Sequence, residues 1–142
     1  MKKYFQKGDI DGFFGLFIDN LLQLMVIYEL CIHVLQFPTE LVIQKILPGS
    51  ALSILLGNLF YSHQAKKLMK KENRDDVTAL PYGINTPSIF AFIFFVMAPV
   101  YFKTEDTDLA WKAGLFACLL SGIMEVAGAF IGDFIRKNTP RA

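Results

Sequence analysis

Four long apolar blocks, separated by charged stretches, constrain this sequence more than any other feature. They cover residues 13–35, 42–61, 84–102 and 109–135. Each is close to the roughly 20 apolar residues that a membrane-spanning helix needs. Hydrophobic residues make up 54% of the chain, above the roughly 45–50% of soluble domains. The sequence therefore predicts an all-α membrane protein with four transmembrane segments.

The Lys and Arg residues predict how these segments are oriented. Three precede the first block, one lies at the first connection, five in the second, two at the third, and three follow the fourth block. Cytoplasmic loops carry an excess of Lys and Arg. We therefore expect a multi-pass protein of the cell (inner or plasma) membrane, with both termini and residues 66–74 cytoplasmic. That basic run is then a topology anchor, and no nucleic-acid partner is expected.

Polar side chains occur inside two of the apolar blocks. Asp19, Asn20 and Gln23 lie deep in the first block, and Glu125 lies near the middle of the fourth. Such residues are costly at membrane depth and usually face the bundle interior or a wet cavity. For the first three, a cavity lining and a polar contact between helices remain two open alternatives. Glu125 is a candidate for a transport role or for a neutralised structural carboxyl.

The third block has an unusual beginning. Residues 77–93 carry no charge, so this stretch can enter the membrane. However, Pro81, Gly83 and Pro87 disfavour a regular helix from residue 77 onwards. Non-helical backbone at membrane depth must be buried in protein or line a cavity. We expect an extended stretch that enters from the cytoplasmic side.

A short helix is expected to follow this extended stretch. Thr86 is suited to be its N-cap, with Pro87 at the first helical position. The apolar run continues to Ala98, before Pro99, which corresponds to about 18 Å of helix at 1.5 Å per residue. Discontinuous helices of this type build substrate sites in secondary transporters. The third segment is therefore predicted to be a broken helix.

The sequence LPYGINTPSIFAFI at residues 80–93 resembles the third transmembrane segment of the xanthine/uracil permease family, also called nucleobase–ascorbate transporters. In that family the segment is a short strand followed by a half-helix, with a Ser-x-Phe-Ala-Phe-Ile type sequence that residues 88–93 match. The family fold has fourteen segments in two inverted repeats. The resemblance implies that this chain supplies segments one to four and is the N-terminal part of a longer chain.

The resemblance also implies a function and a site. The implied function is a permease for a nucleobase such as xanthine, uracil or a related base, coupled to a proton or sodium gradient, with a homodimer of the full-length protein left open. Phe90 would contact the base, partly through its backbone N–H. The family's first segment often has Gln–His where Asp19–Asn20 fall here, which leaves the base and the coupling ion open. The residues assigned to substrate are Phe90, Ser88, Ile89, Thr86, Asn85, Asn20 and Asp19, while Gln23 and Glu125 are assigned to coupling or a polar network.

Other functions remain open from the sequence. One is a sulfate-permease-like anion transporter, and another is a four-helix dimeric exporter whose buried acid on the first helix would be Asp19 or Glu29. A non-transporting membrane scaffold is disfavoured by the broken third segment. Glu29 and His33 are spaced to pair as i,i+4 neighbours. The sequence contains no nucleophile–base pair and no metal-spaced ligand set, so neither an enzyme nor a cofactor or metal site is predicted.

Overall fold

The computed structural model describes residues 8–138, apart from the side chains at positions 133 and 135. The protein is all-helical, with 85% of residues in helices and, in the described range, no strand. Four helices are long and apolar enough to cross a membrane. They coincide with the four apolar blocks, so the prediction of four membrane-length helices is confirmed. These helices are Gly8–Val34, Thr39–Glu72, Thr86–Thr104 and Thr107–Gly132.

Each membrane-length helix is made of one or more shorter elements, and three of them contain a π-helical turn, here η1, η2 and η3. In chain order the elements are α1 (Gly8–Glu29), η1 (Leu30–Val34), α2 (Thr39–Leu41), η2 (Val42–Ile46), α3 (Leu47–Glu72), α4 (Thr86–Phe92), η3 (Ile93–Met97), α5 (Ala98–Thr104) and α6 (Thr107–Asn138). The chain divides into two compact units, of which the first ends at Ile89 and the second begins at Phe90. Each unit is described by itself.

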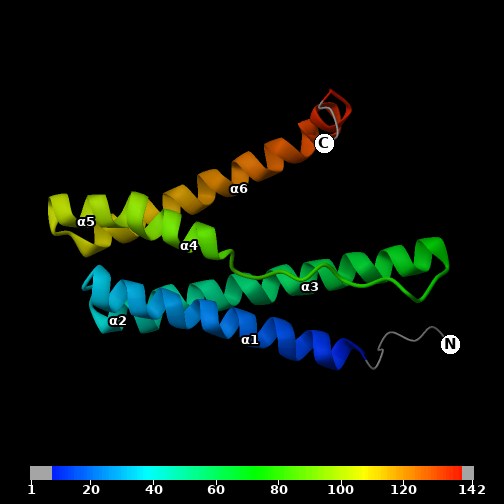
Figure 1. The fold of residues 1–142 in the computed structure, drawn as a ribbon, viewed down its shortest axis with the longest axis horizontal. Coiled ribbons are helices and arrows are strands. Elements are labelled where there is room, and N and C mark those ends of the chain that lie inside the picture. The colour runs from blue at the N-terminus through cyan, green and yellow to red at the C-terminus, as the bar shows by residue number, and fades with distance from the viewer. Residues whose placement is uncertain (1–7, 139–142) are drawn as a thin grey trace. The chain divides into compact units, whose positions relative to one another are not determined.

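In the first unit, α1 and α3 pack as an antiparallel pair (Figure 1). The chain reverses between them at Gln36, whose φ of 51° ends the first helix, and the next N–H, of Phe37, donates to the carbonyl of Cys31 at 2.9 Å. Pro38 then precedes α2. The first helix therefore ends within one residue of the end of the first apolar block, which was placed at residue 35. Buried apolar side chains gather around this reversal of the chain, namely Cys31, Leu35, Phe37, Val42 and Ile46.

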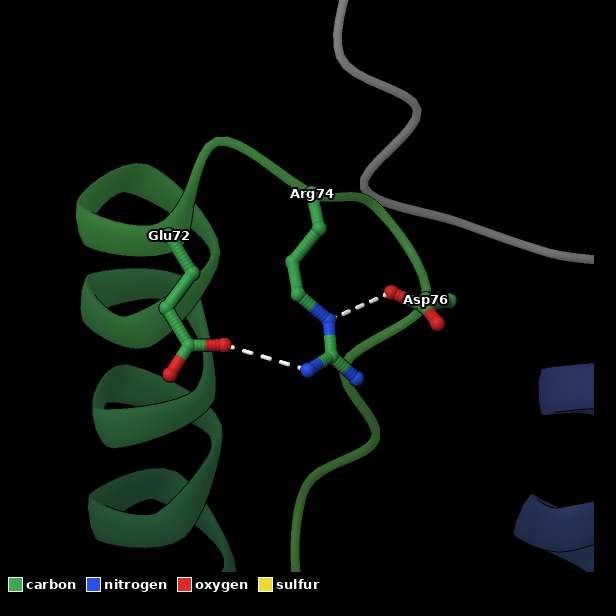
Figure 2. Close-up of polar contacts among 3 residues, drawn as sticks. All are labelled: Glu72, Arg74 and Asp76. Carbon is green, nitrogen blue, oxygen red and sulfur yellow. Dashed lines mark hydrogen bonds and ion pairs between the residues drawn. The ribbon is translucent and has the colours of Figure 1, made fainter.

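Residues 73–85, here called the return segment, form no helix. α3 ends at Asn73, which adopts the left-handed conformation with φ 52° and donates its N–H to the carbonyl of Met69. Just beyond, Arg74 pairs with Glu72 at 3.1 Å and with Asp76 at 2.6 Å (Figure 2). The segment then runs back along α3 until α4 begins (Figure 1). The predicted non-helical stretch is confirmed, and the helix begins at Thr86, one residue before the predicted first helical residue, Pro87.

In the second unit, η3 and α5 pack against α6. Met97, Ala98 and Ala110 are buried there. Gly114 of α6 makes room for Met97, since a Cβ at this position would lie 2.8 Å from the Met97 Sδ. A left-handed residue, Glu105 with φ 54°, ends α5 before α6 begins. This unit is a helical hairpin built around one methionine.

The helix that begins at Thr86 does not stop before Pro99. It continues to Thr104 and holds 19 residues, which is about 28 Å at 1.5 Å per residue. The prediction of an 18 Å helix was wrong because η3 precedes Pro99. A π-helical turn removes the need for the N–H that proline lacks and moves the preceding turn away from its ring. The same solution occurs at Pro48, which follows η2 inside the Thr39–Glu72 helix.

Most apolar side chains on the long helices are exposed. In the most apolar stretch of each helix, the buried share ranges from 6% for the fourth to 22% for the third. Phe95 and Phe130 are 80% and 84% exposed. Contiguous exposed apolar surface of this extent marks a membrane or protein interface. The four helices therefore have the surface of membrane-embedded segments.

Candidate functional site

The return segment is held to α3 by the side-chain amide of Asn58. Its Oδ1 accepts the backbone N–H of Tyr82 at 3.2 Å, and its Nδ2 donates to the backbone carbonyl of Tyr82 at 2.7 Å. Nδ2 also donates to the carbonyl of Ile54 within α3, at 2.9 Å. A single amide thus supplies both hydrogen bonds that a neighbouring strand would offer to this residue. Backbone that leaves the helix here is still hydrogen-bonded.

A second amide, from α1, holds the next part of the segment. Asn20 is buried, with 7% exposure. Its Oδ1 accepts the N–H of Ile84 at 3.1 Å, and its Nδ2 donates to the carbonyl of Leu16 at 2.9 Å. The two alternatives for Asn20 were a cavity lining and a polar contact between segments. In the structure Asn20 makes the polar contact, and we call Asn20 and Asn58 together the asparagine clamp.

Two glycines allow the backbone to approach the clamp. A Cβ on Gly83 would lie 2.7 Å from the Asn20 Oδ1, so any side chain there would displace the amide. A Cβ on Gly57 of α3 would overlap the ring of Tyr82. Because glycine is the residue that permits such approaches, Gly57 and Gly83 explain how an extended segment fits closely against two helices.

The start of α4 is capped by Asn85. Its Oδ1 accepts the N–H of Ser88 at 3.1 Å and the Ser88 hydroxyl lies at 3.3 Å, while its carbonyl accepts the N–H of Ile89 at 3.1 Å. This is the bonding pattern of an N-cap residue. The prediction that Thr86 is the cap and Pro87 the first helical residue was therefore wrong by one position. Asn, like Thr, is a favoured cap, and only the geometry distinguishes the two.

Thr86 instead contacts α1. The Gln23 Nε2 donates to the Thr86 hydroxyl oxygen at 2.8 Å. Gln23 lies near the middle of the Gly8–Val34 helix, so α4 begins at the level of the middle of its neighbour. The Gln23 Oε1 is buried and has no hydrogen-bond partner among the described residues. A buried acceptor without a partner is costly. This oxygen is therefore the atom of the site at which a hydrogen-bond donor of a ligand would be most favourable.

Beyond the cap, the predicted site residues differ in exposure along α4. Ser88 is half-buried, Ile89 is 5% exposed and Phe90 is 41% exposed. Ile89 is the first member of a buried stripe that continues with Ile93 and Met97. The Phe90 ring is stacked with Phe94 of the same helix, with centroids 5.9 Å apart. Ile89 thus packs, while the Phe90 ring retains an accessible surface.

Three other polar candidates are not part of this cluster. Asp19 is exposed on α1, although its neighbour Asn20 is buried. Glu29 pairs with His33 at 3.2 Å, and both side chains are more than half exposed, so the predicted i,i+4 pair is confirmed. Glu125 is exposed on α6 in the second unit, and no hydrogen bond or ion pair joins it to another described side chain. The polar side chains of the first segment therefore lie partly on a buried side and partly on an exposed side of the helix.

Sequence reasoning missed Asn58 and Tyr82. Asn58 lies in the apolar run Leu-Leu-Gly-Asn-Leu-Phe at residues 55–60, and a lone amide at such depth is the same signal that drew attention to Asn20. Its partner, the backbone of Tyr82, could not be predicted, because the sequence does not show which non-helical backbone packs beside Asn58. Within residues 8–138, no three His, Cys, Asp or Glu side chains are grouped closely enough to hold a metal ion.

Comparisons of the chain with models of protein families, with curated proteins and with solved structures find no match. What the site can do is therefore inferred from its own geometry and from the motif at residues 80–93. That geometry consists of a non-helical segment that is uncharged from residue 77 to 85, two amides that hold it, and a third amide, Gln23, with one unpaired oxygen.

Proposed function

We propose that this chain is the part of a membrane transporter that presents the return segment and the start of α4 to a transported nucleobase. The observation that carries the proposal is the non-helical backbone of residues 77–85, which is uncharged and is held beside α1 and α3 by the asparagine clamp. In secondary transporters, substrate sites lie near the bilayer midplane at discontinuous helices. The resemblance of residues 80–93 to xanthine/uracil permeases supplies the substrate class. Coupling to a proton or sodium gradient belongs to the same proposal, with Glu125 as a candidate carboxyl.

The chemistry of the site favours a neutral base over an anion. At the start of α4, Pro87 has no N–H, and the N–H groups of Ser88 and Ile89 are already bonded to Asn85. The described hydrogen bonds of Gln23, Thr86 and Asn85 involve no Lys or Arg. An anion would therefore find few free donors and no cation, which disfavours the sulfate-permease-like alternative. A nucleobase has N–H groups that can donate to the Gln23 Oε1.

Gln23 gives the first test of this proposal. In the intact protein that contains this chain, Gln23→Leu should weaken equilibrium binding of radiolabelled xanthine or uracil by about 1–3 kcal/mol, as expected for a lost buried hydrogen bond. Gln44→Leu is the matched control, because Gln44 is an exposed amide of the same unit. Binding should be unaffected by sulfate. Equal affinities of the two variants, or displacement by sulfate, would argue against a base at this site.

Phe90 gives a test that rests on the resemblance. Phe90→Ala should weaken base binding by about 1–3 kcal/mol, since a large aromatic contact is lost. Phe95→Ala is the control, because its ring is on the same helix and is 80% exposed. Affinities should be compared at equal amounts of folded protein. If only Gln23→Leu has an effect, the base would bind at α1 without the Phe90 ring.

A further inference from the structure

A groove separates the last turns of α3 from the first half of the return segment. Its volume is about 390 Å³, and one wall carries side chains of α3 while the other carries residues 77–80. Along α3 the lining residues follow helical spacing, which places them on one face. The lining includes the lysines Lys67 and Lys71 and the apolar or aromatic residues Tyr61, Leu68 and Leu80.

The position of the groove along α3 places it at the membrane surface. The Thr39–Glu72 helix has 34 residues, whereas about 20 suffice to span the hydrocarbon core. Its apolar run ends at Tyr61 and is followed by Ser, His and Gln at residues 62–64. Tyr is enriched at the level of lipid headgroups. The turns beyond Tyr61, which line the groove, therefore lie at headgroup level.

The groove combines two positive charges with an apolar wall. Lys67 and Lys71 are both exposed, and neither forms an ion pair with any described side chain. Arg74, just beyond the end of α3, is already paired with Glu72 and Asp76 (Figure 2). Those two acids are therefore engaged, while Asp75 remains as the nearby exposed carboxylate.

The apolar wall of the groove is exposed. Leu68 is 41% exposed and Leu80 is 65% exposed, and both line the groove. Lysine side chains lay their methylene groups along such surface while the ammonium reaches the headgroup layer. The groove thus offers an apolar channel that ends at two ammonium groups.

We propose that this groove binds one anionic phospholipid, with its phosphate between Lys67 and Lys71 and its upper acyl chain along Leu68 and Leu80. Charge complementarity favours this occupant over a zwitterionic lipid, whose own cation would meet the two lysines. The cytoplasmic leaflet, where the basic connection is expected to lie, is the anionic one. The inference depends on the membrane location of α3 and is independent of any transported substrate.

Two charge-matched variants of the full chain test the site. Lys67→Gln/Lys71→Gln removes the lysines that line the groove, and Lys66→Gln/Lys70→Gln removes two lysines of the same turns that do not line it. Retention of phosphatidylglycerol by protein in neutral detergent is measured by native mass spectrometry, with circular dichroism to confirm equal helix content. The groove variant should bind roughly 30-fold more weakly, since each lysine contributes roughly fivefold. The control variant should retain most of the affinity.

Three further arms decide between a lipid site and general electrostatic attraction. Leu80→Gln should also lower phosphatidylglycerol retention, because it interrupts the apolar wall. Phosphatidylcholine should bind more weakly than phosphatidylglycerol, and glycerol phosphate, which has no acyl chain, should not compete. Equal losses in the two lysine variants, equal binding of both lipids, or competition by glycerol phosphate would each overturn the proposal.

Discussion

Prolines affect this chain in two different ways. Pro48 and Pro99 lie inside continuous membrane-length helices, each directly after a π-helical turn. Pro81 lies in the return segment, where the chain forms no helix between residues 73 and 85. At Pro48 and Pro99 the helix continues although the proline N–H is missing, whereas around Pro81 the chain is not helical.

The difference lies in what surrounds each proline. Around Pro48 and Pro99 the helix continues on both sides, and the hydroxyl of Thr104 donates to the carbonyl of Val100 within the same helix. Around Pro81, the asparagine clamp bonds the backbone of Tyr82 and Ile84, and two glycines permit the close approach. Prolines therefore weaken a helix, but replacement partners from other helices determine whether the chain remains extended.

The largest effect is expected at the buried member of the clamp. Asn20→Leu leaves the N–H of Ile84 without its acceptor at a position where water is scarce, which should lower the free energy of unfolding by about 1–3 kcal/mol. Amide hydrogen exchange of residues 82–84 should accelerate. Asp19→Leu is the control, because Asp19 is exposed on the same helix. Denaturation in mixed micelles with increasing SDS measures both variants, and equal stability of the two would show that the clamp does not hold the segment.

A smaller effect is expected at the glycines of α3. Gly57→Ala places a methyl group against the Tyr82 ring, while Gly49→Ala meets nothing within 4 Å. In a helix, Ala is favoured over Gly by roughly 1 kcal/mol, so Gly49→Ala should stabilise the protein. Gly57→Ala should cancel or reverse this gain, since overpacking costs about 1–3 kcal/mol. The same SDS titration compares them, and an equal gain in both would mean that Tyr82 moves freely away from α3.

The sequence predicted the four helices and the start of α4 because both depend on local signals. Apolar length defined the helices, and the Asn-Thr-Pro sequence at residues 85–87 placed the helix start within one residue. The continuation through Pro99 was missed, because a π-helical turn in η3 leaves no recognisable composition. The clamp was missed in part, because Asn20 was identified as buried and polar but its bond to Ile84 depends on which segments pack together.

A still smaller effect is expected when the prolines themselves are replaced. Pro48→Ala restores an N–H inside a helix, and this new amide should be protected from exchange because a carbonyl one turn earlier can accept it. Pro81→Ala should leave residues 77–84 without helical protection, since the asparagine clamp still bonds Tyr82 and Ile84. Both changes should alter the free energy of unfolding by less than about 1 kcal/mol, well below the about 3 kcal/mol that proline costs in a regular helix interior. Helical protection across residues 77–84 in Pro81→Ala would show that the proline, and not the clamp, keeps the segment extended.

The smallest effect is expected where the return segment begins, at Arg74. Its hydrogen bond and charge hold the pKa of Asp76 below the ordinary value of 3.8. A carboxyl with a lowered pKa stabilises the folded state above its ordinary pKa, and this contribution is lost as the pH falls through the lowered pKa. Because both side chains are at least half exposed, solvent screening keeps the contribution to stability small. Arg74→Gln should raise the pKa of Asp76 toward 3.8, measured by NMR of the carboxyl carbon, without a resolvable change in unfolding at pH 7.

Lys70→Gln removes the same charge without breaking this pair, so it should leave the Asp76 titration nearly unchanged. An Asp76 titration that is identical in Arg74→Gln and the original protein would mean that the pair is not formed in solution, and that the asparagine clamp alone positions the segment.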